Sequence, residues 1–66
     1  MTVNVNNIQK DIHDESSVAS LIVQLNIAAK GIAIAVNNEI VTKDKWQETL
    51  VKESDQITII QATQGG

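Results

Sequence analysis

Apolar and polar residues alternate near the start of the chain, and this period of two is typical of half-buried strands. Residues 2–6 (TVNVN) follow the pattern, and residues 8–13 (IQKDIH) supply a second strand. Asn6 and Asn7 lie between the two stretches. Because asparagine tolerates a positive φ better than most residues, we predict a tight hairpin turn at this pair.

The period changes to that of a helix in residues 14–27 (DESSVASLIVQLNI). An apolar stripe at spacing i, i+3, i+4 and i+7 marks one helical face and consists of Val18, Leu21, Ile22 and Leu25. Ser17 directly precedes the stripe and is the predicted N-cap, since its hydroxyl can accept a hydrogen bond from an N–H of the first turn. Full burial of each large apolar side chain contributes about 1.5–3 kcal/mol, so this stripe is the largest block of the expected core.

The second half of the chain begins with a predicted hairpin. In residues 32–36 (IAIAV) the two isoleucines and Val36 fall on one face and the two alanines on the other. Asn37 and Asn38 predict a second tight turn, and residues 39–42 (EIVT) predict a short return strand.

A polar connection, residues 43–50 (KDKWQETL), separates this hairpin from the last strand. Trp46 and Leu50 are its large apolar residues, so we expect both to anchor it, with Trp46 filling the core or its edge. A turn at residues 53–56 (ESDQ) then leads into the final strand, residues 56–63 (QITIIQAT).

The order strand, strand, helix, strand, short strand, connection and strand matches the β-grasp, the ubiquitin-like fold. We therefore predict an α+β protein with a mixed four- to five-stranded sheet and one main helix on one face. The predicted core consists of Val3, Val5, Leu21, Leu25, Ile34, Val36, Ile57 and Ile59. Residues 1–62 are expected to form this single domain, and residues 63–66 a flexible C-terminal tail that ends in Gly-Gly.

One helix covers only one face of a sheet, so the other face is open to solvent or to a partner. The strand phases place small and apolar side chains there, namely Ala33, Ala35, Thr58, Ile60 and Ala62. Exposed apolar patches often mark interaction sites, although single exposed apolar residues are common on any surface. We predict a docking patch, because these residues lie on the strand that leads into the tail and on its neighbour.

Composition removes several classes of function from consideration. There is no cysteine and one histidine, His13, so neither a metal site nor a nucleophile with an adjacent base is expected. The five lysines are scattered, arginine is absent and Trp46 is the single aromatic residue, which argues against a nucleic-acid interface. No run approaches the roughly 20 apolar residues of a membrane span, and the first ten residues do not resemble a signal peptide, so we expect a cytoplasmic protein.

The last three residues, Gln64, Gly65 and Gly66, indicate a different kind of function. Glycine has no side chain and the broadest φ/ψ range, so such a segment can enter a narrow channel in a partner where any Cβ would clash. It can then present its carboxylate to chemistry housed in that partner. An extended chain advances about 3.3–3.6 Å per residue, so Gly66 can lie up to roughly 17 Å from Gln61. The alternative is a frayed terminus with no role.

A Gly-Gly end directly after the last strand of a β-grasp pattern is a stronger signal than the dipeptide alone. The chain resembles the sulfur carrier proteins of bacterial thiamine biosynthesis (the ThiS family) over essentially its whole length. The features that carry the resemblance are AVNNEIV (35–41), Trp46 in a polar connection, Leu50, SDQITII (54–60) and the terminal Gly65-Gly66. It departs at two turns, because the family usually has a glycine where Ser54 stands and often a proline near Thr42 and Lys43.

The resemblance implies a carrier and not an enzyme. A separate adenylating enzyme, using ATP and magnesium, would activate the carboxylate of Gly66, which would then become a thiocarboxylate. The thiocarboxylate would donate its sulfur to thiazole synthase for formation of the thiazole ring. The chain itself would bind no cofactor and would be a monomer when free.

Three other functions remain open at this point. The small subunit of molybdopterin synthase has the same fold and chemistry, but that family tends to be longer and to carry prolines before its Gly-Gly. A ubiquitin-like modifier would instead be conjugated to lysines through Gly66. A pure interaction module would have an inert tail.

Overall fold

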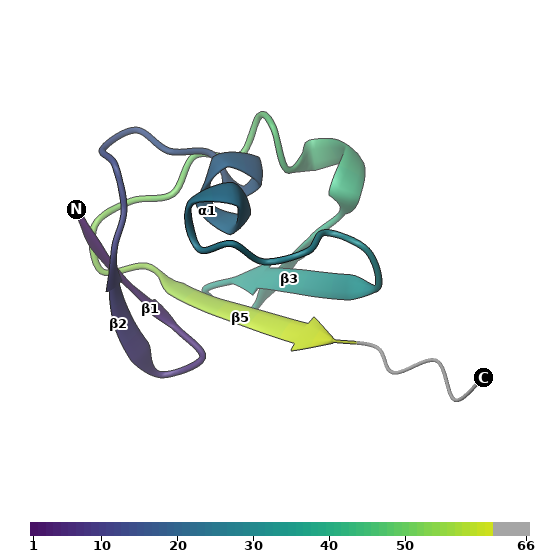
Figure 1. Ribbon diagram of the computed structural model, residues 1–66, viewed down its shortest axis with the longest axis horizontal. Helices are drawn as coiled ribbons and strands as arrows, with labels where there is room; N and C mark the ends of the chain where they lie inside the picture. The colour runs from purple at the N-terminus through teal and green to yellow at the C-terminus, as the bar shows by residue number, and fades with distance from the viewer. Residues whose placement is uncertain (62–66) are drawn as a thin grey trace.

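A computed structural model of the protein describes residues 1–61. Its elements are β1 (Thr2–Val5), β2 (Ile8–Asp11), α1 (Val18–Gln24), β3 (Ile32–Val36), β4 (Glu39–Val41), the short 3-10 helix η1 (Lys43–Lys45) and β5 (Gln56–Gln61). The five strands form one sheet in the order β2-β1-β5-β3-β4, and α1 lies across one face of it (Figure 1). Because β5 runs parallel to β1 and antiparallel to β3, the sheet is mixed, as predicted.

Both asparagine pairs form the predicted turns. Asn6 and Asn7 join β1 to β2 with φ values of 51° and 69°, and Asn37 and Asn38 join β3 to β4 with φ values of 51° and 70°. Two successive residues with positive φ are characteristic of the two-residue hairpin turn whose twist suits the flanking strands. Each turn also determines which residues of its two strands face one another.

Helix α1 has seven residues, a length at which an isolated helix is not stable in water. The Ser17 hydroxyl accepts a hydrogen bond from the Ser20 N–H at 3.1 Å, which confirms the predicted N-cap. The Gln24 side chain ties the last turn to the preceding loop, accepting from the His13 N–H and donating to the Ser16 hydroxyl, each at 2.8 Å. The helix therefore depends on these contacts and on its buried face. No helix within residues 1–61 is long and apolar enough to cross a membrane.

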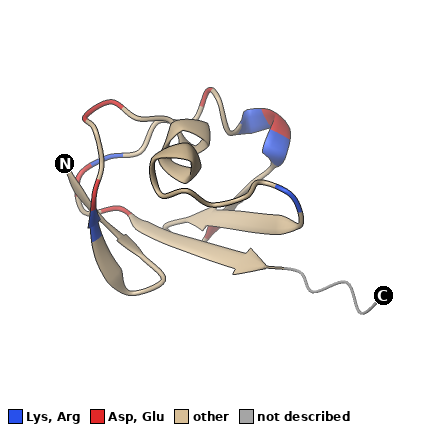
Figure 2. Ribbon diagram, in the orientation of Figure 1, with Lys and Arg blue, Asp and Glu red and all other residues tan. Residues whose placement is uncertain are grey.

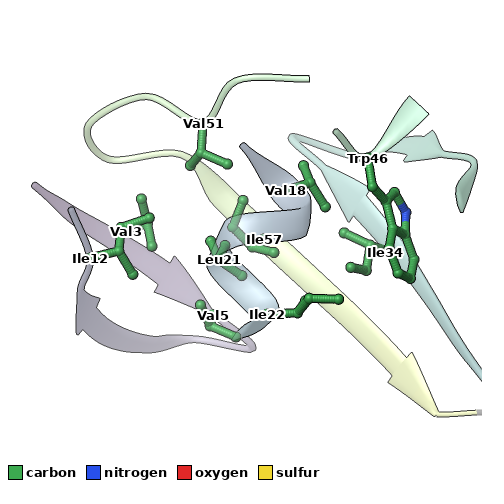
Figure 3. Close-up of a cluster of buried hydrophobic side chains, with 10 residues drawn as sticks. All are labelled: Val3, Val5, Ile12, Val18, Leu21, Ile22, Ile34, Trp46, Val51 and Ile57. Atoms are coloured by element: carbon green, nitrogen blue, oxygen red, sulfur yellow. The ribbon is translucent and has the colours of Figure 1, made fainter. Parts of the chain in front are cut away.

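The core lies between α1 and the sheet (Figure 3), and every residue predicted for it either belongs to the buried cluster or packs against it. Five of the predicted residues are buried: Val3, Val5, Leu21, Ile34 and Ile57. The other three, Leu25, Val36 and Ile59, are partly buried and pack against that cluster. Sequence reasoning missed Ile12 and Val51, which are also buried.

The connection between η1 and β5 has one of the two predicted anchors. Trp46 is buried and its Nε1 donates to the Val41 carbonyl at 2.9 Å, so its indole fills the core as predicted. The prediction that Leu50 is the second anchor is wrong, because its side chain is exposed and that of the next residue, Val51, is buried instead. Leu50 forms an antiparallel bridge with Ser17, and in such an extended segment successive side chains point to opposite sides.

Ser54, in the turn before β5, has a φ of 68°, a left-handed conformation that is unfavourable for most residues other than glycine. Its N–H donates to the Thr2 carbonyl at 2.8 Å, a bond that any residue at this position can make. We expect Ser54→Gly to raise the free energy of unfolding by about 0.5–1 kcal/mol, since relief of left-handed strain exceeds the extra flexibility of the unfolded chain. Urea denaturation measures the change, and a destabilised variant would contradict this explanation.

Candidate functional site

Strand β5 occupies the middle of the sheet and leads toward the residues predicted to act. It is paired with β1 on one side and β3 on the other, and its end lies on the opposite side of the molecule from Met1 (Figure 1). Gln64, Gly65 and Gly66, the predicted tail residues, lie outside the described residues, as does Ala62 of the predicted patch. Their roles therefore stay predictions, and the described part of the site is the strand and the sheet face beside it.

Pairing of β5 with β3 brings together the predicted patch residues on the face of the sheet that α1 does not cover. Ala33 lies opposite Ile60, and Ala35 lies opposite Thr58. The Ile60 side chain is 55% exposed, and Thr58 and Ala33 are also exposed. Ile57 on β5 and Ile34 on β3, which alternate with these residues along the strands, are buried on the helix side, in agreement with the predicted faces of both strands.

Ala35 differs from the prediction in one respect. It lies on the open face, yet only 8% of its surface is exposed. Its neighbours across the two ladders are Ile40 on β4 and Thr58 on β5, and both side chains are larger than its methyl group. A partner approaching this face would therefore touch those neighbours, and Ala35 would form the floor between them.

Ile40 is a patch residue that sequence reasoning missed. It lies opposite Ala35 on the edge strand β4, and its side chain is 65% exposed. The signal was present in the sequence, because a two-residue turn at Asn37-Asn38 places Val36 opposite Glu39 and Ala35 opposite Ile40. We use the name open-face patch for the set Ala33, Ala35, Ile40, Thr58 and Ile60.

Most of the open-face patch lies on two strands without charged residues, β3 and β5, while Ile40 lies on β4 next to Glu39. Neither β3 nor β5 contains a charged residue, and both ribbons are tan along their length in Figure 2. Lysine and acidic side chains lie on other elements, including η1 with Lys43, Asp44 and Lys45. Contact with a partner here would remove apolar atoms from water without the desolvation cost of a charge.

Within residues 1–61, no group of three or more His, Cys, Asp or Glu side chains is placed to hold a metal ion. A groove of about 400 Å³ runs beside β4, and its charged lining mixes Glu39 and Asp55 with Lys45 and Lys52. What the described geometry offers instead is an apolar surface next to a strand that leads to Gly65 and Gly66.

Comparison with known proteins identifies what this combination resembles. Residues 3–66 match the model of the ThiS family, so the match includes the Gly-Gly end. The sulfur carrier protein ThiS of Escherichia coli (strain K12) is 36% identical over 50 residues, which cover 76% of this chain and 76% of that protein.

Two solved structures have the same fold. The crystal structure of the thiamine biosynthesis protein ThiS from Geobacter metallireducens superposes with a TM-score of 0.87 at 23% identity and covers all of both chains. The solution structure of a thiamine biosynthesis protein from the same organism has a TM-score of 0.79 at 23% identity, covering all of this chain and 88% of that one. The predicted ubiquitin-like β-grasp is therefore confirmed.

Proposed function

This chain belongs to the ThiS family and is a sulfur carrier of thiamine biosynthesis, and from that premise we propose that the carboxylate of Gly66 is the group that carries the sulfur. The observation that supports this assignment most directly is the family match, which runs through Gly66 itself. The chain contains no cysteine, so no side-chain thiol is available to hold sulfur. The protein acts as a carrier, and the catalytic groups belong to its partners.

Activation is needed because a carboxylate is a poor acyl donor. An oxygen of the Gly66 carboxylate attacks the α-phosphate of ATP in the active site of an adenylating enzyme, and pyrophosphate leaves. The resulting acyl adenylate has AMP as a good leaving group. Sulfide-level sulfur (HS⁻) then attacks the carbonyl carbon, the bond to AMP breaks, and the products are a thiocarboxylate at Gly66, AMP and a proton. ATP and Mg²⁺ are bound by the enzyme, and this chain supplies only the reacting carbonyl.

The folded body delivers that carbonyl to two different enzymes. The adenylating enzyme activates it, and thiazole synthase accepts its sulfur for the thiazole ring. Since an extended chain spans about 3.3–3.6 Å per residue, Gly66 can reach roughly 17 Å beyond Gln61 while the sheet stays outside the partner's active site. Gly65 and Gln64 would then lie in the narrow channel of the partner that leads to its active site. We propose that the carrier works in the cytoplasm, where ATP is available to the enzyme, and that it is a monomer when free.

The open-face patch is the docking surface for the adenylating enzyme. Its support is the cluster of exposed Ile40, Thr58 and Ile60 on the face that α1 does not cover, two of them on the strand that leads to the tail. An apolar surface presented in this way can be buried by a complementary apolar surface on the partner.

We expect Ile60→Asp to weaken binding to the adenylating enzyme by about 10- to 30-fold, because an unpaired carboxylate would have to be buried in the interface. The cost to folding should stay below about 1 kcal/mol, since the side chain is more than half exposed. Isothermal titration calorimetry measures the first quantity and urea denaturation the second.

Val23→Asp is the matched control for docking. Val23 is also a large exposed apolar residue, at 76%, but it lies on α1, on the far side of the sheet from the patch. The Val23→Asp variant should bind the adenylating enzyme with the same affinity as the wild type. Equal affinities for Ile60→Asp and the wild type would refute the docking surface.

Incubation with the adenylating enzyme and Mg-ATP tests the proposed chemistry directly. Intact-mass spectrometry should show the adenylate, and the carrier purified from its host should show replacement of one terminal oxygen by sulfur. An isopeptide-linked ladder on other proteins would instead indicate a modifier conjugated through Gly66. A chain that is never adenylated would overturn the assignment.

A further inference from the structure

Strand β5 is held on the β1 side by a side chain as well as by backbone pairing. The pairing of β1 with β5 covers Asn4 with Gln56 and Val5 with Ile57, and the Asn6 N–H donates to the Ile57 carbonyl at 2.9 Å. Beyond that point β1 turns away into the hairpin. The Asn6 side chain then continues the ladder by two hydrogen bonds to the next residue on that side of β5.

Both bonds join the Asn6 amide to the backbone of Ile59. The Asn6 Oδ1 accepts from the Ile59 N–H at 2.8 Å, and the Asn6 Nδ2 donates to the Ile59 carbonyl at 3.1 Å. In a parallel ladder these two positions are normally filled by a backbone carbonyl and a backbone N–H of the neighbouring strand. The side chain therefore takes the place of a further strand residue that the turn has removed.

The second asparagine turn holds the other end of the same strand. The Asn37 Oδ1 accepts from the Gln56 N–H at 3.0 Å, and the Asn37 N–H donates to the Gln56 carbonyl at 2.7 Å. The first asparagine of each turn thus pairs with β5, one at its first residue and the other near its last. Of the two, only Asn6 lies near the end of β5 that leads to Gly66.

Building on the proposed function, we propose that Asn6 is a positioning residue for the acyl carrier reaction. Its pairing with Ile59 restrains β5 on the β1 side, while pairing with β3 restrains the other side through Gln61, and together they set the direction in which β5 leaves the sheet toward Gly66. Without the amide, the last residue held on the β1 side becomes Ile57, and two more residues, about 7 Å of chain, lose that restraint. Pairing with β3 remains, so the effect is a loss of precision and not a loss of the strand.

Asn6→Gly tests this role, because glycine readily adopts the left-handed backbone and removes the side-chain amide that bonds to Ile59. We expect the kcat for adenylation of Gly66 to fall by about 3- to 10-fold, since small misplacements of reacting groups are costly in rate. The KM should change less than about twofold, since the open-face patch is untouched and contributes equally before and during the reaction. Hydrogen exchange of the Ile59 amide should become faster.

Asn37→Gly and Asn7→Gly are the matched controls. Asn37→Gly removes the equivalent amide from the start of β5, so the Gln56 amide should exchange faster while kcat stays at the wild-type value. Asn7→Gly changes the same turn as Asn6→Gly, at a residue that also has a positive φ and lies outside both bonds to Ile59. Circular dichroism at the assay temperature confirms that all three variants are folded.

The outcomes separate this inference from the function on which it rests. If the wild type is adenylated and Asn6→Gly has the same kcat as both controls, Asn6 has only a structural role and the inference is wrong. A rise in KM with unchanged kcat would also overturn it, because that pattern reports docking. If the wild type is not adenylated at all, the proposed function fails and the positioning role fails with it.

Discussion

Removal of Gly65 and Gly66 is expected to reduce adenylation of the carrier by at least about 100-fold, with no change in its thermal unfolding. The shortened chain would still end in a carboxylate, at Gln64, but that carboxylate would lie up to about 7 Å short of the position that Gly66 reaches. Adenylation requires reacting atoms about 3–3.5 Å apart, and a misplacement of only 1 Å can cost about 100-fold in rate. Stability should not change, because within residues 1–61 the last side chain that packs against the core is that of Ile59, well before the two removed residues.

Single-turnover adenylation with labelled ATP measures the rate, and circular dichroism measures the melting temperature. Gly66→Ala keeps the chain length and adds one Cβ, so it separates the effect of reach from that of channel width. It should also slow activation strongly and leave the melting temperature unchanged. A large loss of stability in either variant would show that the tail packs on the body, and normal adenylation of the shortened chain would refute the role of Gly66.

Leu21→Ala is expected to lower the free energy of unfolding by about 2–5 kcal/mol. Leu21 is fully buried in the middle of the α1 stripe, where its side chain packs in the cluster that joins the helix to the sheet (Figure 3). Truncation removes its contacts and leaves a cavity that the neighbouring strands cannot fill. At about 0.05–0.15 kcal/mol per residue, a chain of 66 residues has only roughly 3–10 kcal/mol of stability, so the variant is close to unfolding.

The matched control is Val23→Ala, two residues along the same helix. Val23 is largely exposed, and alanine is the better helix former, so the free energy of unfolding should change by less than about 0.5 kcal/mol. Urea denaturation of both variants gives the comparison. Similar losses in the two would show that helix propensity, and not burial of Leu21, is what stabilises α1.

The two hairpins show how far local sequence signals extend. Asn6-Asn7 and Asn37-Asn38 were recognised because positive φ is a local requirement that asparagine meets well. The residues that share one face of a strand could also be predicted, because apolar and polar residues alternate along the sequence. Ile40 could have been assigned to the open face by combining these two signals, since the turn sets the register of β4 against β3.

Other features depended on pairings between distant residues. The anchor of the 43–50 connection was assigned to Leu50, but the bridge to Ser17, 33 positions earlier, turns Val51 inward instead. Ala35 was expected to be accessible, and its burial comes from Ile40 and Thr58 on the two neighbouring strands. Ile8 and Ile12 have the same phase in the predicted second strand, but only Ile12 is buried, a difference that alternation alone does not give.

By itself, the sequence determined the elements, their order, the buried stripe of α1, both turns and the resemblance of the Gly-Gly end to sulfur carriers. These follow from residue types and periodicities that act over a few positions. Only the tertiary structure decided which side chains of the sheet are accessible, which residue anchors the long connection, and how Asn6 and Asn37 hold β5. The physical reason is that burial and hydrogen bonding between distant residues depend on strand register and neighbouring side chains, and neither is set by local preference.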